Sequence, residues 1–558
     1  DSVKNTIKFD PQILKRYVNF MNNPDEDTAV AQFGKDDKYF GVCTLMITMP
    51  GLPMFGHGQI EGFTEKYGME FTKAYRNETP DQNLVNRHWH DIFPLMKKRY
   101  IFANVENFLF YDVWDNGGVN ENIFAYSNSA GNECSVVFYN NKYDRAQGWI
   151  KQSCEYAVKI GQGEDQHVEM RSKSISEGLG LTAGEDRFCV FREHRSGRWF
   201  IRRSREICEK GMFIGLNGFE YQVYMDIHEV ADGPDHKYQI LCDTLQGRGC
   251  HDIETEWQEI QFRELYRPFA DFATAFIPAV AKLIGPSEEK ITEAKLKKAA
   301  KDLIGLYTSA AHTFYTKANE FAGKDVALPA PEKQYKNFAA SLEKILVAFA
   351  NKTAKLSADV PAALKKAKTG AEYLETAFTN SGSLPLLLVA HEMVKEYVKV
   401  GLADAWALAR KFNEFFQNAG AATCDVRYEL SKIFALSKVM DIALMEKDAK
   451  TGASKLVMAL GEDETAPLLS GANAFNGVVW FNKEVIDSSI VNAFALALLD
   501  STDEEAILKQ YASVLSAKDA AGYKCEELVK AFAPAKKKSD SVKSDSKEKP
   551  RAKKSTKK

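Results

Sequence analysis

The sequence predicts a multidomain chain in which an αβ segment with a parallel sheet is followed by an all-β sandwich and then by an all-α domain. Three observations support this prediction. Short apolar strands alternate with helical patterns up to about residue 105, hydrophobicity then recurs with a period of two, and from about residue 253 apolar residues recur three and four positions apart. The predicted boundaries are 1–105, 106–250 and 251–534, with a basic tail at 535–558.

The first segment contains a strand, a helix, a second strand and a second helix in chain order. Residues 17–21 (YVNFM) form the first expected strand, and residues 38–49 form a buried helix that a Pro-Gly pair ends. Residues 52–55 (LPMF) form the next strand, and residues 86–100 form a further helix. This alternation favours a parallel sheet, because parallel strands need a crossover connection between them.

The second region contains short apolar segments separated by turn-forming clusters such as DNGG at 115–118. The expected strands are 108–113, 123–127, 134–139, 187–191, 199–202, 213–216 and 221–227. So many strands, with no helical pattern between most of them, indicate a β-sandwich.

The third region has long Ala/Leu/Lys/Glu runs with helical spacing. The clearest expected helices are 303–314, 338–351, 386–402 and 405–416. No fixed internal period is present, which argues against a helical-repeat solenoid. Residues 536–558 hold eleven Lys or Arg and three Asp or Glu without an apolar run, so we expect a disordered tail. This tail is either a flexible solubilising end or a contact for anionic polymers.

Composition excludes several classes of protein. The 558 residues carry a net charge of −3, so we do not expect a nucleic-acid partner. The longest apolar stretch, residues 41–56, contains two prolines and three glycines, so we expect no membrane span. The nine cysteines never form a CxxC pair. We therefore expect free thiols, no metal site, no cofactor and a cytoplasmic location.

The most informative motif is FMNNPD at residues 20–25, followed by PGLPMFGHGQ at residues 50–59. A strand that ends in a carboxylate on a polar loop is the usual place for a catalytic group in a parallel barrel, because loops at the carboxyl ends of the strands form the active site. Asp25 in that position can stabilise positive charge that grows at an anomeric carbon. The alternative is an ordinary turn, since Asn-Pro-Asp is a frequent turn composition.

These residues resemble the α-amylase family, glycoside hydrolase family 13. Residues 20–25 are similar to its last short signature stretch, in which a strand ends Phe-x-x-Asn-His-Asp, and residues 44–59 resemble its following helix and eighth barrel strand. The resemblance implies that residues 1–105 are the C-terminal part of a (β/α)₈ TIM barrel, and that the all-β domain after it is the one that follows the barrel in the family.

A narrower likeness concerns residues 51–68, which resemble a subgroup of very long bacterial members of the family. Members of that subgroup carry a helical C-terminal region, and residues 476–484 (NGVVWFNKE) resemble a segment of it. The resemblance implies that the all-α domain corresponds to this region. Because the sequence opens at Asp1 without a methionine, we expect it to be the C-terminal fragment of such a protein.

The family resemblance assigns roles to four residues. Asp25 matches the third catalytic carboxylate, which stabilises the transition state, and Asn23 matches the supporting asparagine that binds substrate. His57 and Gln59 are expected to bind substrate, although His57 is alternatively a structural histidine. Pro24 stands where the family usually has a sugar-contacting histidine, so one donor to the sugar is absent.

The resemblance implies an α-glucan-active glycoside hydrolase or transglycosylase, with an α-glucan or maltooligosaccharide as substrate. A retaining glycosidase needs two carboxyl groups, a nucleophile and a general acid. In the family both lie on earlier barrel strands, so we expect this fragment to lack them and to be inactive alone. The alternative is a non-catalytic glucan-binding or scaffold protein with a decayed barrel, which Pro24 favours. The sequence does not predict an oligomeric state.

Overall fold

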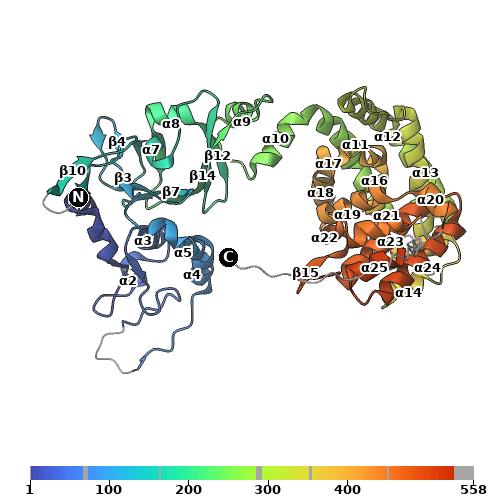
Figure 1. Ribbon diagram of the computed structural model, residues 1–558, viewed down its shortest axis with the longest axis horizontal. Coiled ribbons are helices and arrows are strands. Elements are labelled where there is room, and N and C mark those ends of the chain that lie inside the picture. Colours follow the sequence, from blue (N-terminus) through green and yellow to red (C-terminus); the bar gives the residue numbers. More distant parts are fainter. Residues whose placement is uncertain are drawn as a thin grey trace, which may run out of the picture. The chain divides into compact units, whose positions relative to one another are not determined.

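The computed structural model describes residues 2–66, 73–161, 165–284, 292–350, 355–448 and 452–532. The predicted tail at 535–558 lies outside these residues. The chain divides into two compact units, Asp1–Gln261 and Phe262–Lys558. The first unit contains helices and several sheets, and the second is almost entirely helical (Figure 1).

The first part of unit 1 is helical apart from one pair of parallel strands. Its elements are α1 (Ser2–Phe9), the 3₁₀ helix η1 (Pro11–Arg16), β1 (Val18–Phe20), α2 (Ala29–Phe33), α3 (Asp37–Thr48), β2 (Leu52–Met54), α4 (Gln82–Arg87), the π-helical turn η2 (His88–Ile92), α5 (Phe93–Lys97) and α6 (Arg99–Phe102). The strand, helix and strand predicted at 17–21, 38–49 and 52–55 are confirmed as β1, α3 and β2. Across the described residues this sheet has two strands, and no closed barrel is present.

The second part of unit 1 is built mainly of antiparallel strands. Its elements are β3 (Leu109–Phe110), β4 (Trp114–Asp115), β5 (Gly118–Val119), β6 (Ile123–Ala130), β7 (Glu133–Asn140), β8 (Ala146–Ile150), β9 (Tyr156–Ile160), β10 (His167–Arg171), α7 (Ile175–Leu179), β11 (Arg187–Glu193), β12 (Trp199–Arg203), α8 (Ser204–Lys210), β13 (Met212–Leu216), β14 (Tyr221–Ala231), α9 (Lys237–Leu245) and α10 (Ile253–Gln261). One sheet has the order β12-β11-β14-β7-β6-β3 and the other β13-β8-β4-β5, while β9 and β10 form a hairpin. The helices α7, α8 and α9 lie in the region 106–250 that was predicted to be all-β.

Strand β7 shows why these elements form layers. Val136 and Phe138 belong to a core shared with the four-stranded sheet, whereas Val137 and Tyr139 belong to a core shared with α3. Successive residues of a strand point to opposite faces, so this alternation of apolar residues buries the six-stranded sheet on both sides. In Figure 1 the helices α3 and α5 lie on one side of β7, and β4 lies on the other.

Unit 2 is a helical assembly with one short hairpin. Its elements are α11 (Arg263–Ile284), α12 (Glu293–Ala322), α13 (Pro331–Ala350), α14 (Val360–Leu364), α15 (Gly370–Asn380), α16 (Leu384–Lys399), α17 (Leu402–Ala405), α18 (Leu408–Asn418), α19 (Val426–Val439), α20 (Ile442–Lys447), α21 (Ser454–Gly461), α22 (Ala466–Ser470), β15 (Asn473–Phe475), β16 (Val478–Trp480), α23 (Lys483–Asp500), α24 (Glu504–Ala520) and α25 (Cys525–Phe532). The four helices predicted most clearly are confirmed as parts of α12, α13, α16 and, jointly, α17 and α18.

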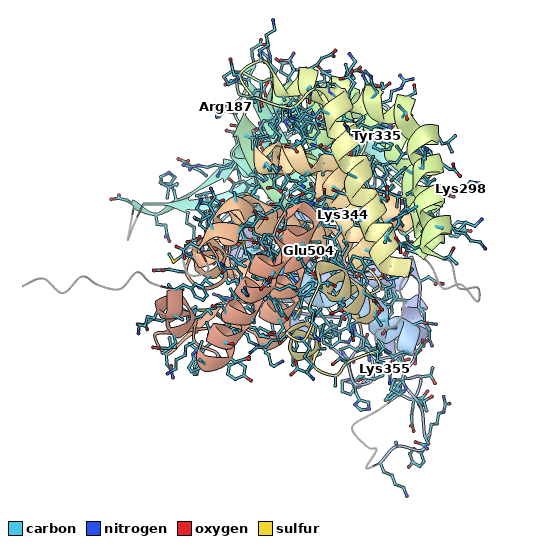
Figure 2. All side chains as sticks on the ribbon, turned by 90° about the vertical axis from the view of Figure 1, so that its right-hand side faces the viewer. Arg187, Lys298, Tyr335, Lys344, Lys355 and Glu504 are labelled. Carbon is cyan, nitrogen blue, oxygen red and sulfur yellow. The ribbon has the colours of Figure 1, made fainter. Side chains whose placement is uncertain are left out.

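Long-range hydrogen bonds join the helices of unit 2 around a single large apolar core. Lys344 of α13 donates to the carbonyl of Leu499 at 2.8 Å, and the Glu504 carboxylate accepts from the Gly370 amide at 2.8 Å. Lys344 and Glu504 are labelled in Figure 2, which views this unit. In the described residues no helix is both long enough and apolar enough to cross a bilayer.

Candidate functional site

The candidate site lies at the carboxyl ends of β1 and β2. The two strands are parallel, with Val18 opposite Leu52 and Phe20 opposite Met54, and α3 is the crossover between them. Parallel neighbours end at the same edge of the sheet, so the loops that follow Phe20 and Met54 emerge side by side. These loops carry all four residues that the sequence assigns to the site.

The loop after β1 is a tight turn that projects Asp25. Asn23 accepts the amide of Asp25 on its side-chain Oδ1 at 2.9 Å, and its carbonyl accepts the amide of Glu26 at 3.2 Å. Pro24 occupies the second position of this turn, where its fixed φ is favourable. The Asp25 side chain is exposed, and its carboxylate has no hydrogen bond or ion pair with any described residue. The turn composition therefore determines the local backbone and leaves the carboxylate free for a ligand.

The loop after β2 is held by the buried side chain of Gln59. Its Oε1 accepts the Gly56 amide at 3.0 Å, and its Nε2 lies 3.2 Å from the sulfur of Met21. The hydroxyl of Tyr39, on α3, donates to the Gln59 carbonyl at 2.8 Å. All three contacts are internal to the protein. Gln59 thus connects the loop after β2 to the end of β1.

His57 differs from Gln59 because its side chain is exposed. Its ring lies 6.3 Å from that of Phe63, measured between centroids. The His57 side chain is therefore accessible from solvent.

The two loops contact each other closely at Gly56 and Asn22. A Cβ on Gly56 would lie 2.5 Å from Oδ1 of Asn22, so the contact requires glycine. The Asn22 side chain is buried, and its Oδ1 has no hydrogen-bond partner among the described residues. Lys66 adds a link, because its Nζ donates to the Asp25 carbonyl at 2.9 Å.

The structure thus brings Asn23 and Asp25 into one turn and places His57 and Gln59 on the adjoining loop. Asn22, Tyr39 and Lys66 were not predicted to belong to the site. The Asn-Asn pair at the strand end was the one available signal for Asn22.

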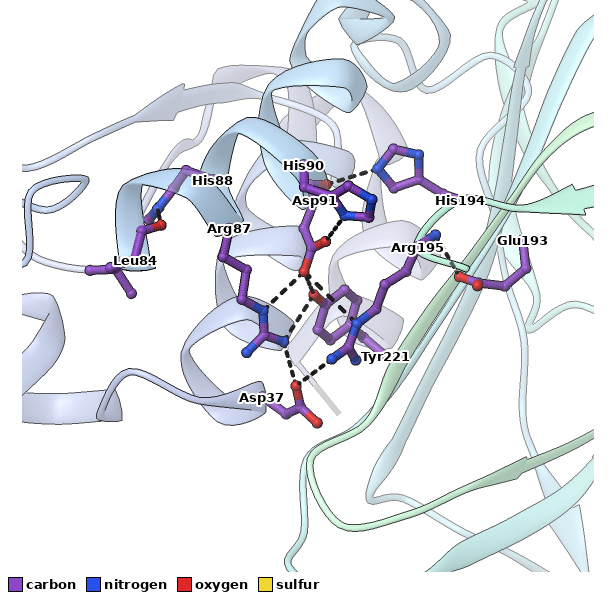
Figure 3. Close-up of polar contacts among 10 residues, drawn as sticks. All are labelled: Asp37, Leu84, Arg87, His88, His90, Asp91, Glu193, His194, Arg195 and Tyr221. Atoms are coloured by element: carbon purple, nitrogen blue, oxygen red, sulfur yellow. Dashed lines mark hydrogen bonds and ion pairs between the residues drawn. The ribbon is translucent and has the colours of Figure 1, made fainter. Parts of the chain in front are cut away.

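A second polar cluster joins the helical layer of unit 1 to the six-stranded sheet (Figure 3). The Asp91 carboxylate, on η2, is almost fully buried and accepts a hydrogen bond from the Tyr221 hydroxyl on β14. Arg87 Nε lies 3.1 Å and His90 Nδ1 2.7 Å from the same carboxylate. Burial disfavours ionisation of Asp91, but the hydrogen bonds from Tyr221, His90 and Arg87 outweigh it and lower its pKa.

Asp37, the first residue of α3, extends this cluster. Its carboxylate pairs with Arg87 and with Arg195 at 3.2 Å, and Arg195 lies in the loop between β11 and β12. Burial and the loss of hydration lower the pKa of His194, whose Nε2 lies 3.0 Å from the Asp91 carbonyl. These side chains form hydrogen bonds and ion pairs with one another. The cluster therefore joins the helical layer to the six-stranded sheet and does not present groups to a ligand.

Within the described ranges, no group of three or more His, Cys, Asp or Glu side chains is placed to hold a metal ion. All nine cysteines are free thiols. Burial raises the pKa of Cys189 to about 12 and that of Cys250 to about 11, so both are protonated and unreactive at neutral pH.

Comparison with known proteins gives similarity in structure but not in sequence. The sequence matches no protein-family model and no curated protein. An α-amylase from Geobacillus thermoleovorans, complexed with acarbose, is similar to 38% of this chain and 39% of its own, with 11% identity and a TM-score of 0.24. An Anoxybacillus α-amylase matches 38% of this chain over 38% of its own length, with 13% identity and a TM-score of 0.24. The cyclomaltodextrin glucanotransferase CldA matches 38% of this chain over 37% of its own length, with 12% identity and a TM-score of 0.23. The chain spans about two fifths of the length of each of these enzymes.

Proposed function

We propose that this chain is the closing part of an α-glucan-active glycoside hydrolase or transglycosylase of the α-amylase family, to which Asp25 contributes a catalytic carboxylate. One observation carries the proposal: the turn with Asp25 and the loop with His57 and Gln59 meet at the carboxyl ends of two parallel strands joined by a helix. This is the location of active sites in parallel α/β barrels. The resemblance of these loops to the family's signature stretches supplies the reaction class.

The contacts of the four residues support different roles. Asp25 is exposed and free of described partners, as expected for a carboxylate that stabilises an oxocarbenium-like transition state. The side-chain oxygen Oδ1 of Asn23 accepts the Asp25 amide and stabilises the turn. Its side-chain nitrogen Nδ2 then donates to a sugar hydroxyl. His57 presents its ring to the substrate, and Gln59 acts on substrate binding through the loop that it holds.

The nucleophile and general acid are proposed to lie on further strands, outside residues 1–558. In a retaining enzyme these two carboxyl groups are about 5–5.5 Å apart. The β1–β2 pair supports the presence of further elements, because Val18, Phe20, Leu52 and Met54 are exposed on one face of it. Parallel sheets are normally buried on both faces, and an isolated two-stranded sheet is at best marginally stable. The free thiols are consistent with the proposed cytoplasmic location.

A non-catalytic glucan-binding or scaffold protein is the second candidate, and Pro24 favours it. Proline has no side-chain donor, so it cannot replace the sugar-contacting histidine of the family. The test is the release of reducing sugar from maltoheptaose and soluble starch by the full-length gene product. Turnover supports the enzyme. Binding without turnover supports the second candidate, and the absence of both contradicts either function.

A further inference from the structure

Three aromatic side chains form a row across the four-stranded sheet of unit 1. Phe213 of β13 is the direct cross-strand neighbour of Trp149 on β8, and Trp149 is the neighbour of Trp114 on β4. The three side chains are 52%, 40% and 51% exposed, respectively, although large aromatic residues usually lie in cores. The residues beside them in sequence point into the core shared by the two sheets: Val113, Ile150 and Ile214. The row therefore lies on the outward face of this sheet.

The geometry of the row is that of an elongated apolar strip. Neighbouring strands lie about 4.8 Å apart, so side chains on three adjacent strands span roughly 10 Å. The ring centroids of Trp149 and Phe213 are 5.3 Å apart, and their planes are inclined by 58°. The two rings are therefore in contact but not coplanar. The strip is also far smaller than the roughly 800 Å² per partner that a stable protein interface buries.

Hydrogen-bonding groups flank the strip on both sides. Gln147 and Lys151 lie two residues before and after Trp149, so they share its outward face, and both are exposed. Gly215 is the cross-strand neighbour of Gln147 and has no side chain, so the surface beside the rings is open there. The side chain nearest to the position that a Cβ of residue 215 would take is that of Arg145, at 3.9 Å. The strip thus has hydrogen-bonding side chains within reach on its own face.

Sugar chains have the chemistry that this surface matches. The C–H faces of pyranose rings stack on aromatic rings, while their hydroxyls both donate and accept hydrogen bonds. We propose that Trp114, Trp149 and Phe213 form an accessory binding platform for an α-glucan chain, separate from the candidate site. The choice of an α-linked chain rests on the proposed function, whereas the sugar chemistry rests on the row itself.

The platform lies on the far side of the sheets from the candidate site. Helix α3 packs on one face of the six-stranded sheet, and the four-stranded sheet covers the other face. The aromatic row lies on the outer surface of that four-stranded sheet. A glucan bound there therefore does not contact Asp25, and the two sites are separable by mutation.

The test is affinity electrophoresis of the 558-residue chain in gels with amylose, together with fluorescence titration by maltoheptaose, since Trp114 and Trp149 are exposed reporters. Trp114→Ala and Trp149→Ala are each expected to weaken binding about tenfold, which corresponds to about 1.4 kcal/mol. Trp89→Ala is the matched control, because Trp89 is a 62% exposed tryptophan of the same unit. This control is expected to bind as the parent does, and thermal unfolding verifies that every variant is folded.

The alternatives give distinct results. No retardation by amylose, or retardation that survives both tryptophan substitutions, overturns the platform. Binding that is lost in Asp25→Asn assigns the glucan to the candidate site, which overturns the platform but supports the proposed function. Binding of cellohexaose in place of maltoheptaose, lost in Trp149→Ala, overturns the choice of an α-linked chain.

Discussion

The hydroxyl of Tyr221 donates to the buried carboxylate of Asp91 and so joins β14 of the six-stranded sheet to the π-helical turn η2. Tyr221→Phe removes this donor and leaves a buried carboxylate with one partner fewer. We expect a loss of stability of about 1–3 kcal/mol in unit 1, because a hydrogen bond to a charged group is lost. Thermal unfolding measures the change. Tyr224→Phe is the matched control, since the Tyr224 hydroxyl donates to the side chain of Gln222 on the same strand and not to a buried charge. An equal loss in both variants would contradict the role given to Asp91.

The pKa of Asp91 predicts how stability depends on pH. Its folded-state pKa is lowered from the ordinary value, with burial opposed and outweighed by hydrogen bonds from Tyr221, His90 and Arg87. The ionised carboxylate therefore stabilises the fold above the unfolded-state pKa of about 3.9, and this contribution is lost as the pH falls through the lower folded-state pKa. The stability difference between the parent and Asp91→Asn should shrink as the pH falls below about 4. A difference that does not change between pH 7 and pH 3 would contradict this account.

Gly56→Ala tests the contact between the two loops of the candidate site. The added methyl group would meet Oδ1 of Asn22 at 2.5 Å, so one loop must shift. Overpacking of this kind costs about 1–3 kcal/mol. Gly118→Ala is the control, because its nearest neighbour is a backbone oxygen at 3.9 Å. Hydrogen exchange should show faster exchange in the loops after β1 and β2 in Gly56→Ala alone. Unchanged exchange there would mean that the loops do not depend on each other.

Residues 262–532 and residues 1–102 should differ in their ability to fold alone. Residues 262–532 bury their own apolar core, so this fragment is expected to unfold cooperatively. Residues 1–102 share their core with the six-stranded sheet, through contacts of Phe40 and Phe102 with the cluster that contains Tyr139. That fragment should be largely unfolded. Circular dichroism during heating compares the two fragments. A cooperative transition in the shorter fragment with none in the longer one would contradict this assignment of the two cores.

Much of the fold follows from local sequence patterns. β1, α3 and β2 are predictable because apolar residues, a Pro-Gly break and a polar loop follow one another at the right spacing. β8 was not predicted because Trp149 faces outward and Gly148 interrupts the strand. A Cβ on Gly148 would lie 2.6 Å from Val113, so close approach of β4 requires this glycine. Gly148 is required by a long-range contact, and no local sequence pattern contains such a contact.

The candidate site was predictable only in part. The turn of Asn23 and Asp25 is local, and the sequence places both residues correctly in one loop. The hydrogen bond from Tyr39 to Gln59 joins residues twenty positions apart, so it depends on how α3 packs. The contacts of Asp91 with Tyr221 and Arg195 join segments more than a hundred residues apart. Such contacts are consequences of the tertiary fold and leave no periodic signal.

Steady-state kinetics of Asp25→Asn in the full-length protein tests the proposal that Asp25 is a catalytic carboxylate. Asp27→Asn is the matched control, because Asp27 is an exposed aspartate of the same loop. Loss of one group that stabilises charge in the transition state should lower kcat about 10²–10³-fold, with a much smaller change in KM. Asp27→Asn should stay within about threefold of the parent, or about 0.65 kcal/mol. If kcat of Asp25→Asn also stayed within about threefold on maltoheptaose and soluble starch, Asp25 would be a turn residue and the account would be wrong.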